Sequence, residues 1–255
     1  MKLTDTSLLL LITVVVFFAM YIGAILFQGK GFLKPQTCFN ILNANAALII
    51  ISCGMSLVMI TGGIDISVGG VVALVSMCCA VYLDYHGGNI FGAIGISLLI
   101  GLGFGLGYLV AYLDIQPFIV SLAGMFFARG MTTIVNTNPF NVANEQFVAL
   151  KDTRITIPGM GSVNKLGNYV NAYIEIGVVV ALLVVILLFC VLRFTKFGRK
   201  FYAVGGNSQS ALMLGINVKR TKFFAYLICS VLAGIGGFVY FMHVGSGSAS
   251  HASGM

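Results

Sequence analysis

Seven apolar runs, each long enough to cross a membrane or nearly so, constrain this fold more than any other feature. The first extends from Ser7 to Phe27. As a helix rising about 1.5 Å per residue it would be about 31 Å long, which matches a hydrocarbon core of roughly 30 Å. The other six cover approximately Ala44 to Ile60, Ile66 to Leu83, Ile90 to Leu113, Pro117 to Asn136, Tyr173 to Leu192 and Phe223 to His243.

The spans are predicted to be helices that together form one bundle. None of the runs shows sustained alternation, and within lipid only a helix or a closed barrel pairs every backbone polar group. With 59% hydrophobic and 8% charged residues, the chain is far from the roughly 25% charged residues of soluble domains. We therefore expect an all-α, polytopic integral membrane bundle, with residues 1–255 forming a single transmembrane domain in the cell (inner) membrane.

A basic loop at 193–222 orients the bundle. It holds seven of the 14 Lys and Arg residues and no acidic residue: Arg193, Lys196, Arg199, Lys200, Lys219, Arg220 and Lys222. Short basic loops beside spans face the cytoplasm, which explains the net charge of +7 without a nucleic-acid partner. Parity then places the amino terminus in the cytoplasm and residues 137–172 outside. If the run from Ile66 were re-entrant after the short Thr61–Asp65 link, the first two spans would reverse.

The polar segment 137–172 is predicted to be a loop with a short helix. It serves either as a surface for an extracytoplasmic partner or as a solvated connection. Within the spans, glycines are the most distinctive residues. Gly101 with Gly105, and Gly103 with Gly107, are four residues apart, a spacing typical of close helix packing.

Sequence features of an enzyme or of a metal site are not found. The chain has neither a GxxxxGK[ST] phosphate loop nor a strand followed by GxGxxG. His86, His243 and His251 lack metal-ligand spacing, and the six cysteines include no CxxC pair. We expect no cofactor and no metal on this chain, so any ATP would be used by a separate subunit.

The segment Thr61–Gly70 interrupts apolar sequence with four glycines, two hydroxyls and a carboxylate. A charge at membrane depth is costly and usually faces a cavity or a partner. A broken helix here would make this segment a translocation route or gate, as in many transporters. The candidate residues are Gly62, Gly63, Asp65, Ser67 and Gly69, together with Arg129 from a later span. Alternatively the segment is a cytoplasmic turn in which Asp65 or Ser67 caps the next helix. Arg129 would pair with Asp65 or another polar group, or extend to an interface.

The basic loop contains a predicted two-turn helix. Asn207 or Ser208 can cap its start, and it would end at Leu214 with Gly215 in the left-handed conformation. Such a helix would expose Ala211, Leu212 and Met213, a surface suited to the groove of a partner.

Three stretches resemble the permease subunits of ribose-type simple-sugar ATP-binding-cassette importers, most closely the galactofuranose branch. The segment Gly62–Gly69 is similar to the family's GGIDLSVG signature, and Leu122–Gly130 is similar to its LAGMFFxRG segment. The stretch from Phe197 through Gly205-Gly206-Asn207 to Gly215-Ile216 is similar to its cytoplasmic loop.

The resemblance implies a subunit that moves a monosaccharide by alternating access, with ATP used by a separate ATPase subunit. Further implied partners are a periplasmic or extracellular sugar-binding protein and a second permease, identical or paralogous, in a lipid membrane. The loop 193–222 would be the coupling element, with these contact residues: Gly198, Ala203, Gly205, Gly206, Asn207, Ser208, Ala211, Leu212, Gly215 and Ile216.

Two departures from that family are apparent. Its coupling helix often has Pro-Glu before paired alanines, whereas this chain has Ser208, Gln209 and Ser210, so a salt bridge from that glutamate is unavailable. The family also continues beyond a seventh span, so we expect the sequence to be incomplete at its carboxyl end. The rival interpretations are a stand-alone secondary transporter or channel, with few ion-coupling candidates in its spans, and an intramembrane enzyme dependent on its histidines.

Overall fold

The computed structural model describes residues 5–28, 34–163 and 169–250, which divide into two compact units. The first unit comprises residues 1–42 and 154–174. It contains α1 (Asp5–Gln28), the start of α2 (Pro35–Ile60), β2 (Arg154–Val163) and β3 (Tyr169–Glu175), and the two strands pair in one sheet.

Gln36 ties the start of α2 to β3. Its side-chain oxygen accepts a hydrogen bond from the Tyr173 backbone N–H at 2.9 Å, and its amide nitrogen donates to the Tyr173 carbonyl at 3.4 Å. The Arg154 guanidinium lies 4.4 Å from the centre of the Tyr173 ring. The expectation of a loop with a short helix at 137–172 is therefore incomplete, because much of this segment is strand.

The second unit comprises residues 43–153 and 175–255. Besides the rest of α2 it contains α3 (Val68–Asp84), α4 (Ile90–Gly103), α5 (Gly107–Ala111), α6 (Pro117–Val135), β1 (Phe140–Asn141), α7 (Glu145–Lys151), α8 (Ile176–Phe194), α9 (Lys196–Gly206), α10 (Ser208–Met213), α11 (Val218–Val244) and β4 (Ser246–Gly247). The short strands β1 and β4 pair antiparallel.

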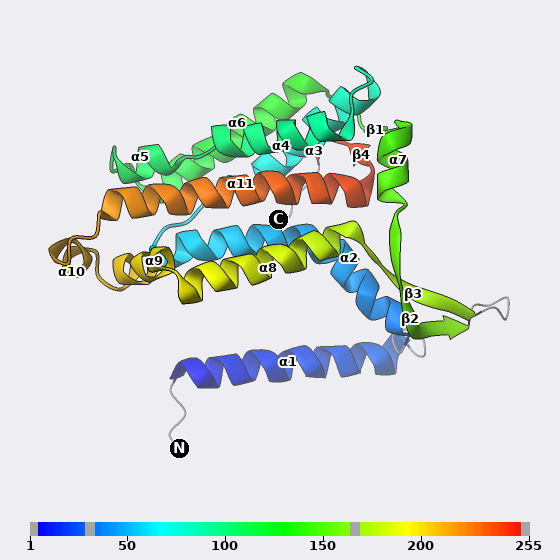
Figure 1. The fold of residues 1–255 in the computed structure, drawn as a ribbon, viewed down its shortest axis with the longest axis horizontal. Coiled ribbons are helices and arrows are strands. Elements are labelled where there is room, and N and C mark those ends of the chain that lie inside the picture. The colour runs from blue at the N-terminus through cyan, green and yellow to red at the C-terminus, as the bar shows by residue number, and fades with distance from the viewer. Residues whose placement is uncertain (1–4, 29–33, 164–168, 251–255) are drawn as a thin grey trace. The chain divides into compact units, whose positions relative to one another are not determined.

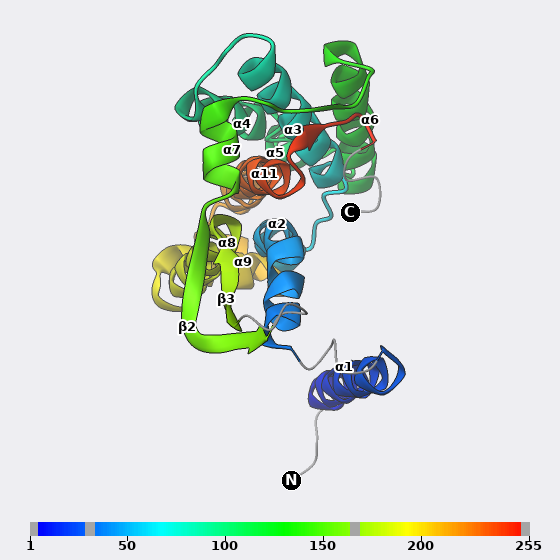
Figure 2. The same cartoon turned by 90° about the vertical axis from the view of Figure 1, so that its right-hand side faces the viewer.

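Helix α11 is the core of the second unit, with α3 to α6 on one side and α8 with the second half of α2 on the other (Figures 1 and 2). Three of its glycines allow close approach on three sides. A Cβ on Gly236 would lie 2.8 Å from Ile51 of α2, and one on Gly237 would lie 2.9 Å from Val75 of α3. A Cβ on Gly234 would collide with the Ser97 carbonyl of α4. Small residues thus let α11 contact three helices at once.

The described residues contain six helical segments long and apolar enough to span a membrane, as predicted for a polytopic helix bundle. The predicted run from Ile66 to Leu83 forms the shorter helix α3. The predicted run from Ile90 to Leu113 is not one continuous helix, because α4 ends at Gly103 and α5 begins at Gly107. Helix α2 starts nine residues earlier than predicted, since its polar first turns are stabilised by contacts with β3.

Residues 61–84 lie alongside α11 in the same direction, so this stretch crosses the unit and is not re-entrant. Ile64 contacts Tyr226, Val72 and Val75 contact Gly237, and Ala80 contacts Gly247. The non-helical part, Thr61 to Ser67, replaces the first turns that a full-length spanning helix would have.

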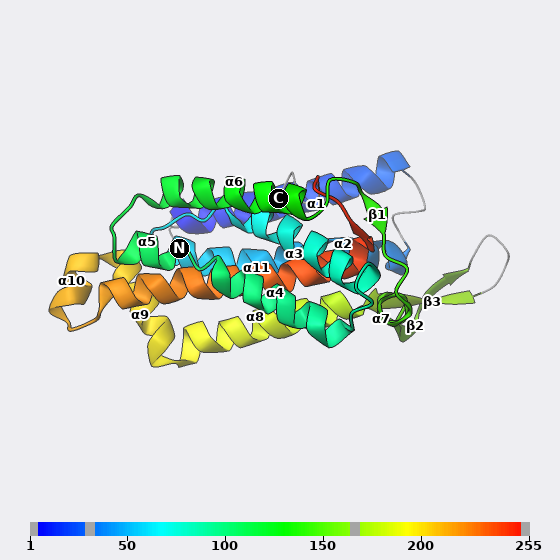
Figure 3. The same cartoon turned by 90° about the horizontal axis from the view of Figure 1, so that it is seen from above.

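The two ends of the second unit are chemically different. One end gathers the end of α2, α5, α9, α10 and the start of α11 (Figure 3). The Lys219 ammonium lies 3.6 Å from the Asp114 carboxylate there. At the other end, His243 contacts Glu175 at 2.8 Å, and the Ala143 N–H donates to Asp84 at 3.0 Å. The basic loop and residues 137–153 therefore lie at opposite ends, as the predicted topology requires.

Of the four predicted packing glycines, Gly101 and Gly103 form a matched pair for a test of packing, because their surroundings differ. A Cβ on Gly101 would lie 2.7 Å from the Ser230 carbonyl of α11, whereas one on Gly103 would meet nothing within 4 Å. We expect Gly101→Ala to lower the free energy of unfolding by about 1 to 3 kcal/mol through overpacking. Gly103→Ala should change it by less than about 0.5 kcal/mol, as at an ordinary exposed site. Unfolding titrations in detergent test both, and equal losses would contradict this packing.

Candidate functional site

The segment Thr61–Ser67 leaves α2 through a left-handed glycine. Gly62 has φ +78°, its N–H donates to Met59, and the Gly63 N–H donates to Val58. These hydrogen bonds satisfy carbonyl groups in the last turn of the helix, and glycine adopts the required φ without strain. The chain then continues in a non-helical conformation until α3 begins at Val68.

The carboxyl group of Asp65 lies inside the protein. Asp65 is only 1% exposed, and its Oδ1 accepts two hydrogen bonds from Ser67: one from the backbone N–H at 3.0 Å and one from the hydroxyl at 2.5 Å. Ser67 occupies the cap position of α3 but makes no side-chain capping bond. Asp65 thus holds the turn before α3 by accepting both hydrogen bonds from Ser67, and both residues are buried.

Helix α11 holds the same segment from the other side. The Tyr226 hydroxyl donates to the Ile64 carbonyl at 3.1 Å, and the Cys229 thiol makes a side-chain hydrogen bond with Asp65. A Cβ on Gly63 would collide with the Tyr226 hydroxyl, so glycine is needed for this approach. Sequence reasoning did not identify Tyr226 or Cys229; the only signal was a polar aromatic residue in an apolar run.

The segment is placed within the thickness of the bundle. Tyr226 and Cys229 lie about 12 Å and 16 Å along α11 from its first residue, at a rise of about 1.5 Å per residue. The apolar run of α11 begins at Phe223, so Asp65 and the Ile64 carbonyl lie beyond its start. Non-helical backbone at such a depth is found where it is buried in protein or lines a cavity.

Helix α6 packs against the start of α3. A Cβ on Gly124 would lie 3.2 Å from Ser67, and one on Gly70 would lie 2.9 Å from the Met125 carbonyl. Gly69 is buried beside Gly70 in the first turn of α3. Arg129 is half-buried on α6, beyond the residues that contact Ser67. The contacts of the Asp65 carboxyl given above come from Ser67 and Cys229, and the pairing of Arg129 with Asp65 or another polar group stays a prediction.

The first half of the basic loop is a helix, α9, that the sequence did not predict. The Thr195 hydroxyl accepts from the Gly198 N–H at 3.1 Å and caps its start. The buried Phe201 packs in a cluster with Leu57 of α2, Leu188 of α8 and Ala225 of α11. Helix α9 is therefore anchored to three spans.

Helix α10 matches its prediction closely. The Asn207 side chain accepts from the Ser210 N–H at 2.9 Å, α10 ends at Met213, and Gly215 has φ +77°. Leu212, Met213 and Leu214 are 64%, 89% and 78% exposed. Ala211 was predicted to be exposed but is buried, because the chain after α10 turns back toward it, with the Ile216 N–H donating to the Ala211 carbonyl.

A predicted coupling residue, Gly205, lies against the end of α2, directly before the Thr61–Ser67 segment. A Cβ on Gly205, at the end of α9, would collide with the carbonyl of Ile60, the last residue of α2, whereas one on the adjacent Gly206 would meet nothing within 4 Å. Of the other predicted loop residues, Gly198 is buried against Leu192, Ala203 and Ile216 are half-buried, and the Ser208 hydroxyl donates to the Val204 carbonyl. Thus α10 is linked to the buried segment through α9 and the end of α2.

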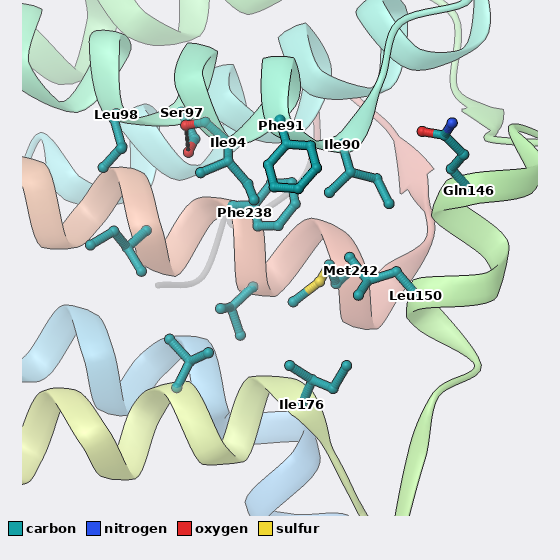
Figure 4. Close-up of a pocket in the computed structure, with 13 residues that line it drawn as sticks. Ile90, Phe91, Ile94, Ser97, Leu98, Gln146, Leu150, Ile176, Phe238 and Met242 are labelled. Atoms are coloured by element: carbon teal, nitrogen blue, oxygen red, sulfur yellow. Dashed lines mark hydrogen bonds between the residues drawn. The ribbon is translucent and has the colours of Figure 1, made fainter.

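A separate cavity of about 680 Å³ lies between α4, α7, α8 and α11, at the other end of the unit (Figure 4). Its lining is almost entirely apolar, with Ser97 and Gln146 as the polar side chains. Sugar hydroxyls require hydrogen-bonding partners, so this cavity is unsuited to a sugar. Among the described residues, no group of three or more His, Cys, Asp or Glu side chains is placed to hold a metal ion.

Comparison with known proteins gives a family match over most of the chain. Residues 37–255 match the family described as branched-chain amino acid transport system / permease component. The chain is 34% identical over 245 residues to the inner membrane ABC transporter permease protein YjfF of Escherichia coli (strain K12), covering 95% of this chain and 70% of that protein.

Two further relatives are named for sugars. The fructose import permease protein FruG of Bifidobacterium longum is 37% identical over 207 residues, covering 79% of this chain and 58% of that protein. The ribose import permease protein RbsC of Bacillus subtilis is 31% identical over 221 residues, covering 82% and 61%. The chain thus spans about 58% to 70% of the length of these relatives. No solved structure gives a significant match.

Proposed function

Because the chain belongs to the branched-chain amino acid transport system permease-component family, we propose that it is the membrane-spanning subunit of an ATP-driven importer of a monosaccharide. A permease component is a transport subunit and not an enzyme, and this one is a multi-pass protein of the inner membrane. The relatives named for fructose and ribose import support the class of substrate. The finer resemblance to the galactofuranose branch stays a prediction, since none of these relatives is named for that sugar.

The contact between Gly205 and Ile60 is the observation that carries the proposed mechanism. In the proposed mechanism, α10 docks on a separate ATPase subunit, which uses the ATP. Because α9 is packed against the ends of α2 and α8 and against α11, displacement of α10 would move these spans. The first non-helical backbone that such a movement would reach is Thr61–Ser67. Its few hydrogen bonds, to Tyr226 and within the turn, can be rearranged more easily than those of a continuous helix.

Alternating access requires that each partner bind one conformation better than the other. A sugar-binding protein would engage the end that carries residues 137–153, and the ATPase the end that carries α10. A second permease, identical or paralogous, would complete the pathway. The candidate gate is then Gly62, Gly63, Asp65, Ser67 and Gly69, with Arg129 as a structural residue of α6.

The exposed apolar tip of α10 provides a test of ATPase docking. We expect Met213→Glu to weaken binding of the ATPase subunit about tenfold or more, because it places a charge in an apolar contact. Gln209→Glu adds the same charge to the same helix outside the apolar tip, where the resembling coupling helices often carry glutamate, and should not weaken binding. Co-purification at graded ATPase concentrations gives both affinities, and equal binding by the two variants would contradict docking through α10.

The function itself is tested by uptake of labelled ribose or fructose into vesicles that contain the full transporter. Uptake should require ATP and the ATPase subunit, and it should persist when ion gradients are abolished. Uptake that follows an ion gradient in the absence of the ATPase would instead identify a secondary transporter.

A further inference from the structure

A cleft of about 420 Å³ lies between α9 and the start of α11. Phe197 and Lys200 line it from α9, and Gly215, Asn217, Arg220, Thr221 and Phe224 line it from the turn before α11 and its first turns. It is distinct from the exposed tip of α10 and from the Thr61–Ser67 segment.

The cleft carries positive charge that no described acidic residue balances. Residues 193–222 contain no Asp or Glu, and the two salt bridges described, Lys219 with Asp114 and His243 with Glu175, involve neither Lys200 nor Arg220. The Arg220 guanidinium lies 5.7 Å from the centre of the Phe224 ring. Two cations that line one concave site favour a ligand with negative charge.

The rest of the lining is half polar and half aromatic. The Asn217 side-chain oxygen accepts from the Arg220 N–H at 2.9 Å, and the Thr221 hydroxyl donates to the Asn217 carbonyl at 2.9 Å, so both side chains are held in place. Phe197 and Phe224 pack edge to face, with ring centres 5.9 Å apart. A ligand with an anionic head and an apolar tail fits such a lining better than a fully polar anion does.

The position of the cleft indicates that such a ligand would come from the membrane. The apolar run of α11 begins at Phe223, directly after Lys219, Arg220 and Lys222, and α8 ends at Phe194. Basic residues beside the end of an apolar run lie at the level of lipid headgroups. The cleft thus lies where the phosphate of a phospholipid is found.

We propose that this cleft binds the phosphate of an anionic phospholipid, with Lys200 and Arg220 contacting the phosphate and Phe197 and Phe224 contacting the start of the acyl chains. A lipid bound there would also contact α9 and so steady the helix that joins α10 to the spans. The inference depends on membrane insertion and does not depend on which solute is transported.

Native mass spectrometry of the purified protein with added phosphatidylglycerol or phosphatidylcholine tests the site. Each basic residue near an anionic surface strengthens binding about fivefold, so the Lys200→Gln/Arg220→Gln variant should bind phosphatidylglycerol about 25-fold more weakly. Arg193→Gln/Lys196→Gln removes the same charge from the same loop outside the cleft, and its loss should be several times smaller. Thermal unfolding of both variants confirms that they are folded.

Four outcomes would overturn the proposal. Equal losses in the two variants would mean that the loop attracts anionic lipid only diffusely, and equal binding of phosphatidylcholine would exclude recognition of negative charge. Displacement of the lipid by millimolar inorganic phosphate would assign the cleft to a soluble anion. Unchanged lipid binding, with loss of the ATPase subunit only in Lys200→Gln/Arg220→Gln, would assign it to the protein partner instead.

Discussion

Gly205→Ala is expected to lower ATP-driven sugar uptake about tenfold or more, whereas Gly206→Ala should leave it nearly unchanged. A methyl group on Gly205 would overlap the Ile60 carbonyl, which is backbone and has no rotamer to change. The end of α9 must therefore move away from the end of α2. Overpacking of this kind costs about 1 to 3 kcal/mol, equivalent to roughly five- to 150-fold in an equilibrium.

Gly206 supplies the matched control, because it is adjacent in sequence, lies in the same helix and has open space where its Cβ would be. Uptake into vesicles, normalised to the amount of assembled transporter, measures the effect. The ATPase activity measured in parallel shows whether hydrolysis continues without transport, as expected if coupling is lost. Equal uptake by Gly205→Ala and Gly206→Ala would contradict a role for the α9–α2 contact.

Replacement of Asp65 by leucine is expected to destabilise the protein by about 2 kcal/mol or more, and Asp65→Asn much less. The Asp65 carboxyl oxygen accepts from both the N–H and the hydroxyl of Ser67 in a buried site. Leucine would leave two buried donors without an acceptor, at about 1 to 3 kcal/mol each. Asparagine retains a side-chain oxygen at the same position and can accept both bonds.

Unfolding titrations in detergent measure the stability of the two variants, and vesicle uptake separates stability from gating. If the carboxyl group only holds the turn, Asp65→Asn will transport normally. If its negative charge is needed when the segment rearranges, Asp65→Asn will be stable but slow. Equal stability of Asp65→Leu and the wild type would contradict the hydrogen bonds described here.

Local signals in the sequence predicted the helices whose ends carry strong caps. Helix α10 is the clearest case, since Asn207 at its start and Gly215 after its end specify a short helix independently of its surroundings. The spans follow from composition, because a long apolar run in lipid has little alternative to a helix. The interruption at Thr61–Ser67 was likewise visible as glycines and a carboxylate in an apolar stretch.

Tertiary contacts determine the features that were missed. Helix α9 contains Gly198, Gly205 and Gly206, which disfavour an isolated helix, and it is stabilised by the burial of Phe201 among three spans. The break between α4 and α5 falls among glycines, where the sequence indicated packing but not the interruption of the helix. Tyr226 contacts the Ile64 carbonyl and Cys229 contacts the Asp65 carboxyl. These residues are far apart in the chain, so no local sequence pattern predicts the contacts.

Photo-crosslinking from position 213 tests most directly the central claim, that α10 meets a separate ATPase inside the cell. A photoreactive amino acid replaces Met213, which is 89% exposed, and a second variant carries it at Leu182, an exposed residue within the apolar span α8. On illumination of intact cells, position 213 should crosslink to the ATPase subunit and position 182 should not. Crosslinking of position 213 to an extracytoplasmic protein, or equal ATPase crosslinking from both positions, would contradict the proposed orientation and the coupling mechanism that depends on it.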